Sequence, residues 1–79
     1  QLTAPTPRRA AKQVFGGLTE RERQVAVLIA HGKSNRDIGD ELVVSERTVE
    51  KHVENILSKL SFTSRAQIAA WAVEKGLNH

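Results

Sequence analysis

The stretch NRDIGDELVVSERTVEKHVE, residues 35–54, decides the fold expected for this chain of 79 residues. Its regularly spaced apolar residues form two pairs, Ile38 with Leu42 and Val49 with Val53. The spacing within each pair is i, i+4, which places both side chains on one face of a helix. The stretch therefore predicts two amphipathic helices with a very short connection between them.

The connection carries signals of its own. Ser45 is a favourable N-cap, because its hydroxyl can accept a hydrogen bond from the amide of Thr48. Val44 and Val49 stand at the N′ and N4 positions of a hydrophobic staple. Gly39 has no Cβ, which would let the second helix cross close by. Two helices joined by so short a turn cannot stack antiparallel, so they must cross steeply, as in a helix-turn-helix.

A helix-turn-helix places its second helix in a DNA major groove, and binding to double-stranded DNA is the leading hypothesis. The net charge of the chain adds little support to this hypothesis. The chain has a formal net charge of +3, but Arg8, Arg9 and Lys12 supply this excess. From residue 13 onward basic and acidic residues balance, so a positive surface requires one-sided placement of the charges.

Length and composition narrow the class further. A chain of this size is one small domain that buries about 60–65% of its unfolded surface, which leaves no room for a buried catalytic cleft. The absence of cysteine excludes disulfides and thiolate metal sites and fits a reducing, cytoplasmic compartment. No signal peptide or apolar run of about 20 residues indicates a membrane. The absence of methionine, even at position 1, suggests a fragment of a longer protein.

The remaining sequence predicts a flexible basic linker or tail over residues 1–17, with both prolines, and a folded domain over residues 18–79. Ser/Thr residues followed three positions later by an acid or amide mark three further helix starts. These starts are Thr19 with Glu22, Ser34 with Asp37 and Ser64 with Gln67. The expected fold is all-α, a four-helix bundle containing the helix-turn-helix, with helices at about 20–30, 35–42, 46–60 and 65–75.

The last helix is apolar nearly all round. One face carries Ile68, Trp71, Ala72 and Lys75, and the opposite face carries Ala66, Ala69, Ala70 and Val73. One face can pack on the domain, whereas the other lies in water unless a partner covers it. This pattern predicts a homodimer interface at Ala66, Ala70 and Val73. The alternative is that alanine serves here as a good helix former at exposed sites.

Six motifs follow one another along the chain: LTERE at 18–22, GKSN at 32–35, SERTV at 45–49, HV at 52–53, ILSKL at 56–60 and SR at 64–65. Together they resemble the LuxR-type, or FixJ/GerE-like, DNA-binding domain over roughly residues 18–77. The resemblance implies a four-helix domain at the C-terminus of a bacterial transcription regulator, behind an upstream sensor or regulatory domain. It also implies pairing of the fourth helix in dimers on two half-sites.

The chain departs from the family pattern in two ways. Many members carry Lys at the position of Glu50 or one turn later, where this chain has Glu54. Many also carry Gly at the position of Ser61, so serine is expected to make the C-cap of the third helix slightly less stable.

Candidate contacts follow from the faces of the helices. Lys51 can donate to guanine O6 and N7, and Glu50 or Glu54 can accept from cytosine N4. Alternatively, the two glutamates form a solvated acidic edge that keeps nonspecific binding weak. Residues at the helix termini, together with His52 and Lys59 further along the third helix, are expected to contact the DNA backbone. These are Lys33, Asn35, Arg36, Ser45, Arg47, Thr48, His52, Lys59 and Arg65.

No arrangement in the sequence supports catalysis, because it contains no Ser/His/Asp set and no P-loop. His52 is interpreted as a packed side chain or phosphate donor rather than a metal ligand, and no metal or cofactor is expected. Two rival functions remain. One is a helical protein–protein interaction module with little or no DNA binding, which the near-neutral folded part favours. The other is an RNA-polymerase-contacting region of sigma-factor type.

Overall fold

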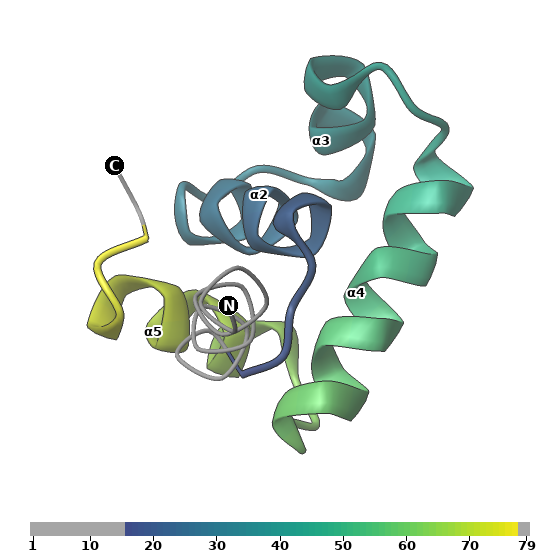
Figure 1. The fold of residues 1–79 in the computed structure, drawn as a ribbon. Coiled ribbons are helices and arrows are strands. Elements are labelled where there is room, and N and C mark those ends of the chain that lie inside the picture. The colour runs from purple at the N-terminus through teal and green to yellow at the C-terminus, as the bar shows by residue number, and fades with distance from the viewer. Residues whose placement is uncertain (1–15, 78–79) are drawn as a thin grey trace, which may run out of the picture.

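The computed structural model describes residues 16–77, which form four helices and contain no strand. The all-α prediction is confirmed, and the last helix ends one residue earlier than expected. The predicted linker lies outside the described residues except for Gly16 and Gly17. The helices are α2 (Glu20–Ala30), α3 (Asn35–Leu42), α4 (Glu46–Leu60) and α5 (Arg65–Glu74), arranged as Figure 1 shows.

Side-chain caps begin the helices where the sequence predicts them. The Thr19 hydroxyl accepts from the amide of Glu22, and the Glu22 carboxylate accepts from the amide of Thr19. Ser64 and Gln67 repeat this reciprocal capping box at α5. At α4 the Ser45 hydroxyl accepts from the Thr48 amide at 3.0 Å. These bonds satisfy amides that have no partner within a helix, so the helix starts are set locally.

Helix α2 occupies the centre of the bundle and packs against the other three helices (Figure 1). The inner stripe of α4 contributes Val49 and Ile56 to the core, both fully buried, while Val53 lies at the edge of the core. Burying this stripe is the main apolar contribution that holds α4 in place. The largest fully buried side chains are those of Leu18, Val25, Ile38, Val49, Ile56 and Ile68.

The turn between α3 and α4 spans residues 43–45 and packs directly against α3. The amide of Val44 donates to the carbonyl of Gly39 at 2.9 Å. A Cβ added to Gly39 would lie 2.7 Å from the carbonyl oxygen of Val44, closer than real Cβ contacts. The close approach predicted for Gly39 is therefore present, and it is made by the turn before α4.

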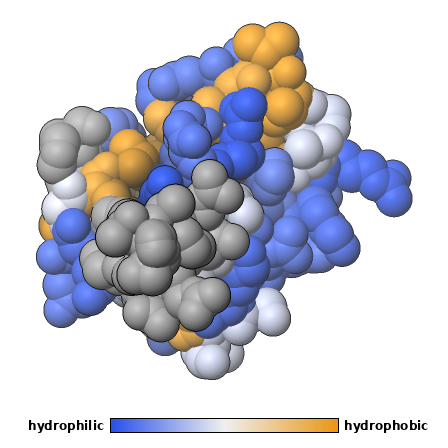
Figure 2. Space-filling view, in the orientation of Figure 1, coloured by the Kyte–Doolittle hydropathy of each residue, from blue (hydrophilic) through white to orange (hydrophobic). Residues whose placement is uncertain are grey.

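Val43 ends α3 in the left-handed conformation, with φ 59° and ψ 48°. Its side chain is 87% exposed, and Figure 2 shows apolar surface at the end of the molecule where this turn lies. A β-branched residue is strained in this region of φ/ψ space. Ser61, which ends α4, has the same conformation with φ 57°, consistent with the expected cost of serine at this C-cap.

We expect Val43→Gly to raise the free energy of unfolding by about 1 kcal/mol, because glycine relieves left-handed strain of about 1–3 kcal/mol and loses some of that gain to its greater unfolded-state entropy. Urea denaturation measures this change. As a control, Glu41→Gly inside α3 should lower stability by roughly 1 kcal/mol. A lower urea midpoint for Val43→Gly than for the parent chain would contradict the assignment of strain.

Candidate nucleic-acid interface

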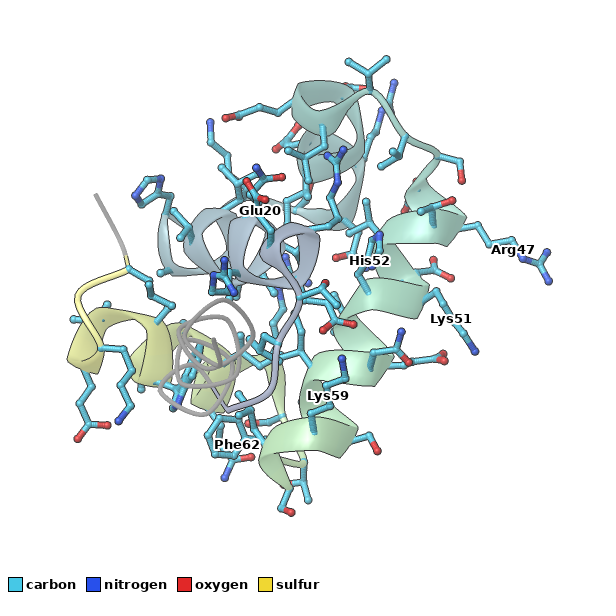
Figure 3. The ribbon with its side chains drawn as sticks, viewed as in Figure 1. Glu20, Arg47, Lys51, His52, Lys59 and Phe62 are labelled. Carbon is cyan, nitrogen blue, oxygen red and sulfur yellow. The ribbon has the colours of Figure 1, made fainter. Side chains whose placement is uncertain are left out.

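The outer face of α4 gathers the side chains predicted to read bases, Glu50, Lys51 and Glu54, together with Arg47, which is predicted to contact the DNA backbone. Arg47, Glu50, Lys51 and Glu54 are exposed and together line one open surface depression of about 480 Å³. Arg47 and Lys51 point away from the other helices (Figure 3), and the surface along this side is hydrophilic (Figure 2). Within the described part of the chain, no hydrogen bond or ion pair holds these four side chains. They are therefore available to an external partner.

The charges on this face form two columns. Arg47 and Lys51 are four residues apart, and so are Glu50 and Glu54, so each pair lies along one line of the helix surface. One column offers N–H donors and the other offers carboxylate acceptors. The base edges of a major groove present the complementary groups, with acceptors on guanine and a donor on cytosine.

The N-termini of α3 and α4 carry the other exposed candidates. Lys33 and Arg36 are exposed at the start of α3. At the start of α4 the Ser45 and Thr48 hydroxyls lie 2.9 Å apart, so both belong to the cap and remain exposed. Unpaired amides and the helix dipole favour an anion at such ends. The structure thus keeps these four residues at surfaces suited to phosphate.

Two other candidates are bonded to each other across the fold. The Arg65 guanidinium donates from Nη1 to Asn35 Oδ1 at 2.6 Å. Its Nη2 donates to the backbone carbonyl of Lys33. Both Arg65 and Asn35 are half-buried. The structure therefore joins the start of α5 to the start of α3 through residues that the sequence assigned separately to the DNA backbone.

Lys59 is exposed, but its ammonium is bonded within the domain. Its Nζ lies 2.7 Å from Oε1 of Glu22, and the Glu22 side chain is nearly buried. Burial alone raises the pKa of Glu22, but the Lys59 ammonium, the Thr19 amide and His52 outweigh it and hold that pKa below its ordinary value. The sequence showed Glu22 as a capping acid. It contained no signal for a partner 37 residues away.

His52 lies between α4 and α2 (Figure 3) and is half-buried. Its Nδ1 is buried and has no hydrogen-bond partner among the described residues. This position agrees with the interpretation of His52 as a packed side chain on the inner face of α4. Across residues 16–77, no cluster of three His, Cys, Asp or Glu side chains is arranged to hold a metal.

The outer face of α5 is open, as the sequence pattern indicates. Ala66, Ala70 and Val73 are exposed, and Val73 is 53% exposed. Ala69, which the pattern placed with them, is instead half-buried and packs against the core. Its Cβ lies between the two faces, so the open stripe is narrower than predicted.

We expect Glu22→Gln to lower the free energy of unfolding by about 1–3 kcal/mol at neutral pH, because it removes one partner of a charge-assisted hydrogen bond. A carboxyl whose pKa is depressed by folding stabilises the fold above its unfolded pKa. That contribution is lost as pH falls through the lower folded pKa. The difference between parent and variant should therefore shrink as pH falls below 4.5, the ordinary value.

Thermal unfolding of the parent chain and Glu22→Gln between pH 7 and pH 2 measures this effect. Glu50→Gln, at an exposed position on α4, is the matched control. Its loss of stability as the pH falls should equal that of the parent chain. Equal losses of stability with acid in the parent chain and Glu22→Gln would show that the Glu22 ion pair contributes nothing.

Comparison with known proteins identifies the family of this chain. Residues 17–72 match the family described as "Bacterial regulatory proteins, luxR family". The uncharacterized transcriptional regulatory protein YhcZ of Bacillus subtilis is 46% identical over 67 residues, covering 85% of this chain and 31% of that protein. The transcriptional regulatory protein LiaR of Bacillus subtilis is 49% identical over 55 residues, covering 70% and 26%.

The response regulator protein VraR of Staphylococcus aureus is 40% identical over 65 residues, covering 82% of this chain and 31% of that protein. The chain thus spans less than a third of the length of each of these three relatives. Among the described residues, no helix has the length and apolar character required to cross a membrane.

Proposed function

The chain belongs to the luxR family of bacterial regulatory proteins, and from this premise we propose that it is the DNA-binding output domain of a transcription regulator. The observation that carries the proposal is the outer face of α4, where four exposed polar side chains line one depression and have no partner within the described residues. A helix held by its inner stripe and open along its outer face suits insertion into a major groove. A regulator that acts on bacterial DNA works in the cytoplasm.

Base recognition is assigned to the two columns of α4. Lys51 donates to guanine O6 or N7, while Glu50 and Glu54 accept from the amino group of cytosine. Alternation of donors and acceptors makes the face selective, because a groove with the wrong base order leaves a carboxylate against an acceptor. The same carboxylates repel phosphates, which keeps nonspecific binding weak.

Contact with the DNA phosphates is assigned to the N-termini of α3 and α4. Lys33 and Arg36 act at the start of α3, and Arg47 acts with the Thr48 hydroxyl at the start of α4. All four residues are exposed, and backbone-positioning residues of this kind accompany the reading face, here the two columns of α4, in helix-turn-helix complexes. These contacts set register and supply affinity independent of sequence.

We expect Arg47→Ala to weaken binding to all duplex sequences and to reduce the salt dependence, because it removes one phosphate contact. Lys51→Ala should instead cost on the order of 1–3 kcal/mol at one base position and relax the preference there. Fluorescence anisotropy on a duplex selected from a random library, beside scrambled and singly substituted duplexes, separates the two effects.

A salt titration between about 50 and 200 mM tests the function itself, because phosphate contacts release counterions and affinity then falls steeply. A version without residues 1–12 controls for the basic tail. Binding that is absent, or that disappears with the tail, would favour the interaction-module rival. Equal losses for Arg47→Ala and Lys51→Ala on selected and scrambled duplexes would show that the two roles are wrongly assigned.

A homodimer through α5 is the second part of the proposal. Ala66, Ala70 and Val73 form a narrow exposed stripe whose small side chains allow a second helix to approach closely. An α5–α5 contact would repeat the reading face on two half-sites. The relatives are more than three times as long as the matched segment, so we also propose that a regulatory domain accompanies this domain in the full-length protein.

We expect Ala70→Glu to abolish or strongly reduce the dimer population, because two carboxylates would meet at the centre of the contact. Analytical ultracentrifugation over a concentration series measures the dissociation constant. Lys75→Glu, exposed beyond the end of α5, is the control and should dimerise like the parent chain. An unchanged dimer population in Ala70→Glu would rule out this stripe as the interface.

A further inference from the structure

Arg65 connects α5 to the start of α3, and within the described residues these two helices do not pack against each other. From the first turn of α5, its guanidinium bonds to the side chain of Asn35 and to the carbonyl of Lys33. Asn35 is the first residue of α3, and Lys33 immediately precedes its N-cap. One side chain of α5 therefore holds both sides of the α3 N-cap.

We propose that Arg65 is a positioning residue, which fixes the start of α3 so that Lys33 and Arg36 face the DNA backbone. This inference rests on the proposed function and gives Arg65 a different role from direct phosphate contact. The two directional bonds go to acceptors within the protein. The half-buried side chain thus directs both terminal nitrogens toward α3.

The chemistry of the contact requires arginine. A planar guanidinium can donate through two nitrogens to two acceptors at fixed positions, and a charged donor makes these bonds stronger than neutral ones. A lysine ammonium retains the charge but is a single point on a flexible stem, so it cannot hold both acceptors in the same geometry. Lysine would, however, serve almost as well as arginine for simple attraction to a phosphate.

The segment held by Arg65 is tied to α2, because the Lys33 amide donates to the Leu28 carbonyl at 3.0 Å, but among the described residues no backbone hydrogen bond ties it to α5. Gly32, with φ 82°, begins the connection to α3, and Lys33, Ser34 and Arg36 are exposed. The cap bond from the Asp37 amide to Ser34 is local and exposed, so it sets where α3 begins but not where that end lies relative to α5. Arg65 supplies this long-range restraint, and the directions of Lys33 and Arg36 depend on it.

The test compares charge-conserving and charge-removing variants on a fluorescein-labelled random 20-base-pair duplex at low salt. We expect Arg65→Lys to bind roughly tenfold more weakly than the parent chain, as weakly as Arg65→Ala, since the loss of one charge-assisted contact corresponds to about that factor. Arg21→Lys, at an exposed arginine of α2 outside the proposed interface, is the matched control and should bind as tightly as the parent chain, whereas Arg47→Ala should not.

Asn35→Ala provides a second variant that leaves every charge in place. A positioning role predicts weaker DNA binding, because the side-chain acceptor for Arg65 is gone. A direct phosphate role predicts unchanged or tighter binding, because the guanidinium is released toward the DNA. Hydrogen exchange at the amides of residues 33–38 should accelerate in Asn35→Ala and Arg65→Lys even without DNA, which tests the restraint independently of binding.

A double-mutant cycle separates positioning from a general loss of stability. Arg65→Lys and Lys33→Ala should combine to less than the product of their separate losses in affinity, whereas Arg65→Lys and Arg47→Ala should multiply. Multiplicative losses in both pairs, or unchanged exchange at residues 33–38, would overturn the inference. Parental binding by Arg65→Lys would do the same. Failure of the proposed function looks different, since the parent chain itself would then show no salt-dependent binding.

Discussion

The close approach of α3 to the turn before α4 is the constraint on which the interface depends. Because Gly39 has no Cβ, the backbone of Val44 reaches a position that the Cβ of any other residue at position 39 would block. Val43 takes a strained left-handed conformation to complete the same turn. The left-handed backbone of Val43 and the missing Cβ of Gly39 together set the direction in which α4 leaves α3. The outward projection of the reading face follows from that direction.

The cationic side chains discussed above fall into two groups, those bonded within the protein and those without an internal partner. Lys59 and Arg65 bond within the protein, one to the carboxylate of Glu22 and the other to the start of α3. Arg47 and Lys51 have no such bonds and remain on the surface. The bonds of Lys59 and Arg65 within the protein restrain α4 and the start of α3, and these helices also carry exposed cations. The near-neutral folded part is thus compatible with DNA binding, because the placement of exposed cations matters more for phosphate contact than the net charge.

Much of the fold could be predicted because the signals are local. Caps such as Thr19 and Ser45 act within one helical turn, so helix starts follow directly from residues three positions apart. The inner and outer faces of α4 follow from a period of 3.6 residues, which placed Val49 inside and Lys51 outside. Ala69 was misassigned, because it lies at the boundary between two faces and the neighbouring helix decides its burial.

By itself, the sequence determined the four helices, their caps, the apolar stripe and the side chains that face outward, since each depends on residues within a few positions of one another. The tertiary structure decided which polar candidates remain available to a partner. Glu22 and Lys59 are 37 residues apart, and Asn35 and Arg65 are 30 apart. Periodicity and capping contain no information about such pairs, because their meeting depends on how whole helices pack. Packing alone therefore distinguished the cations that hold the domain together from those that face outward.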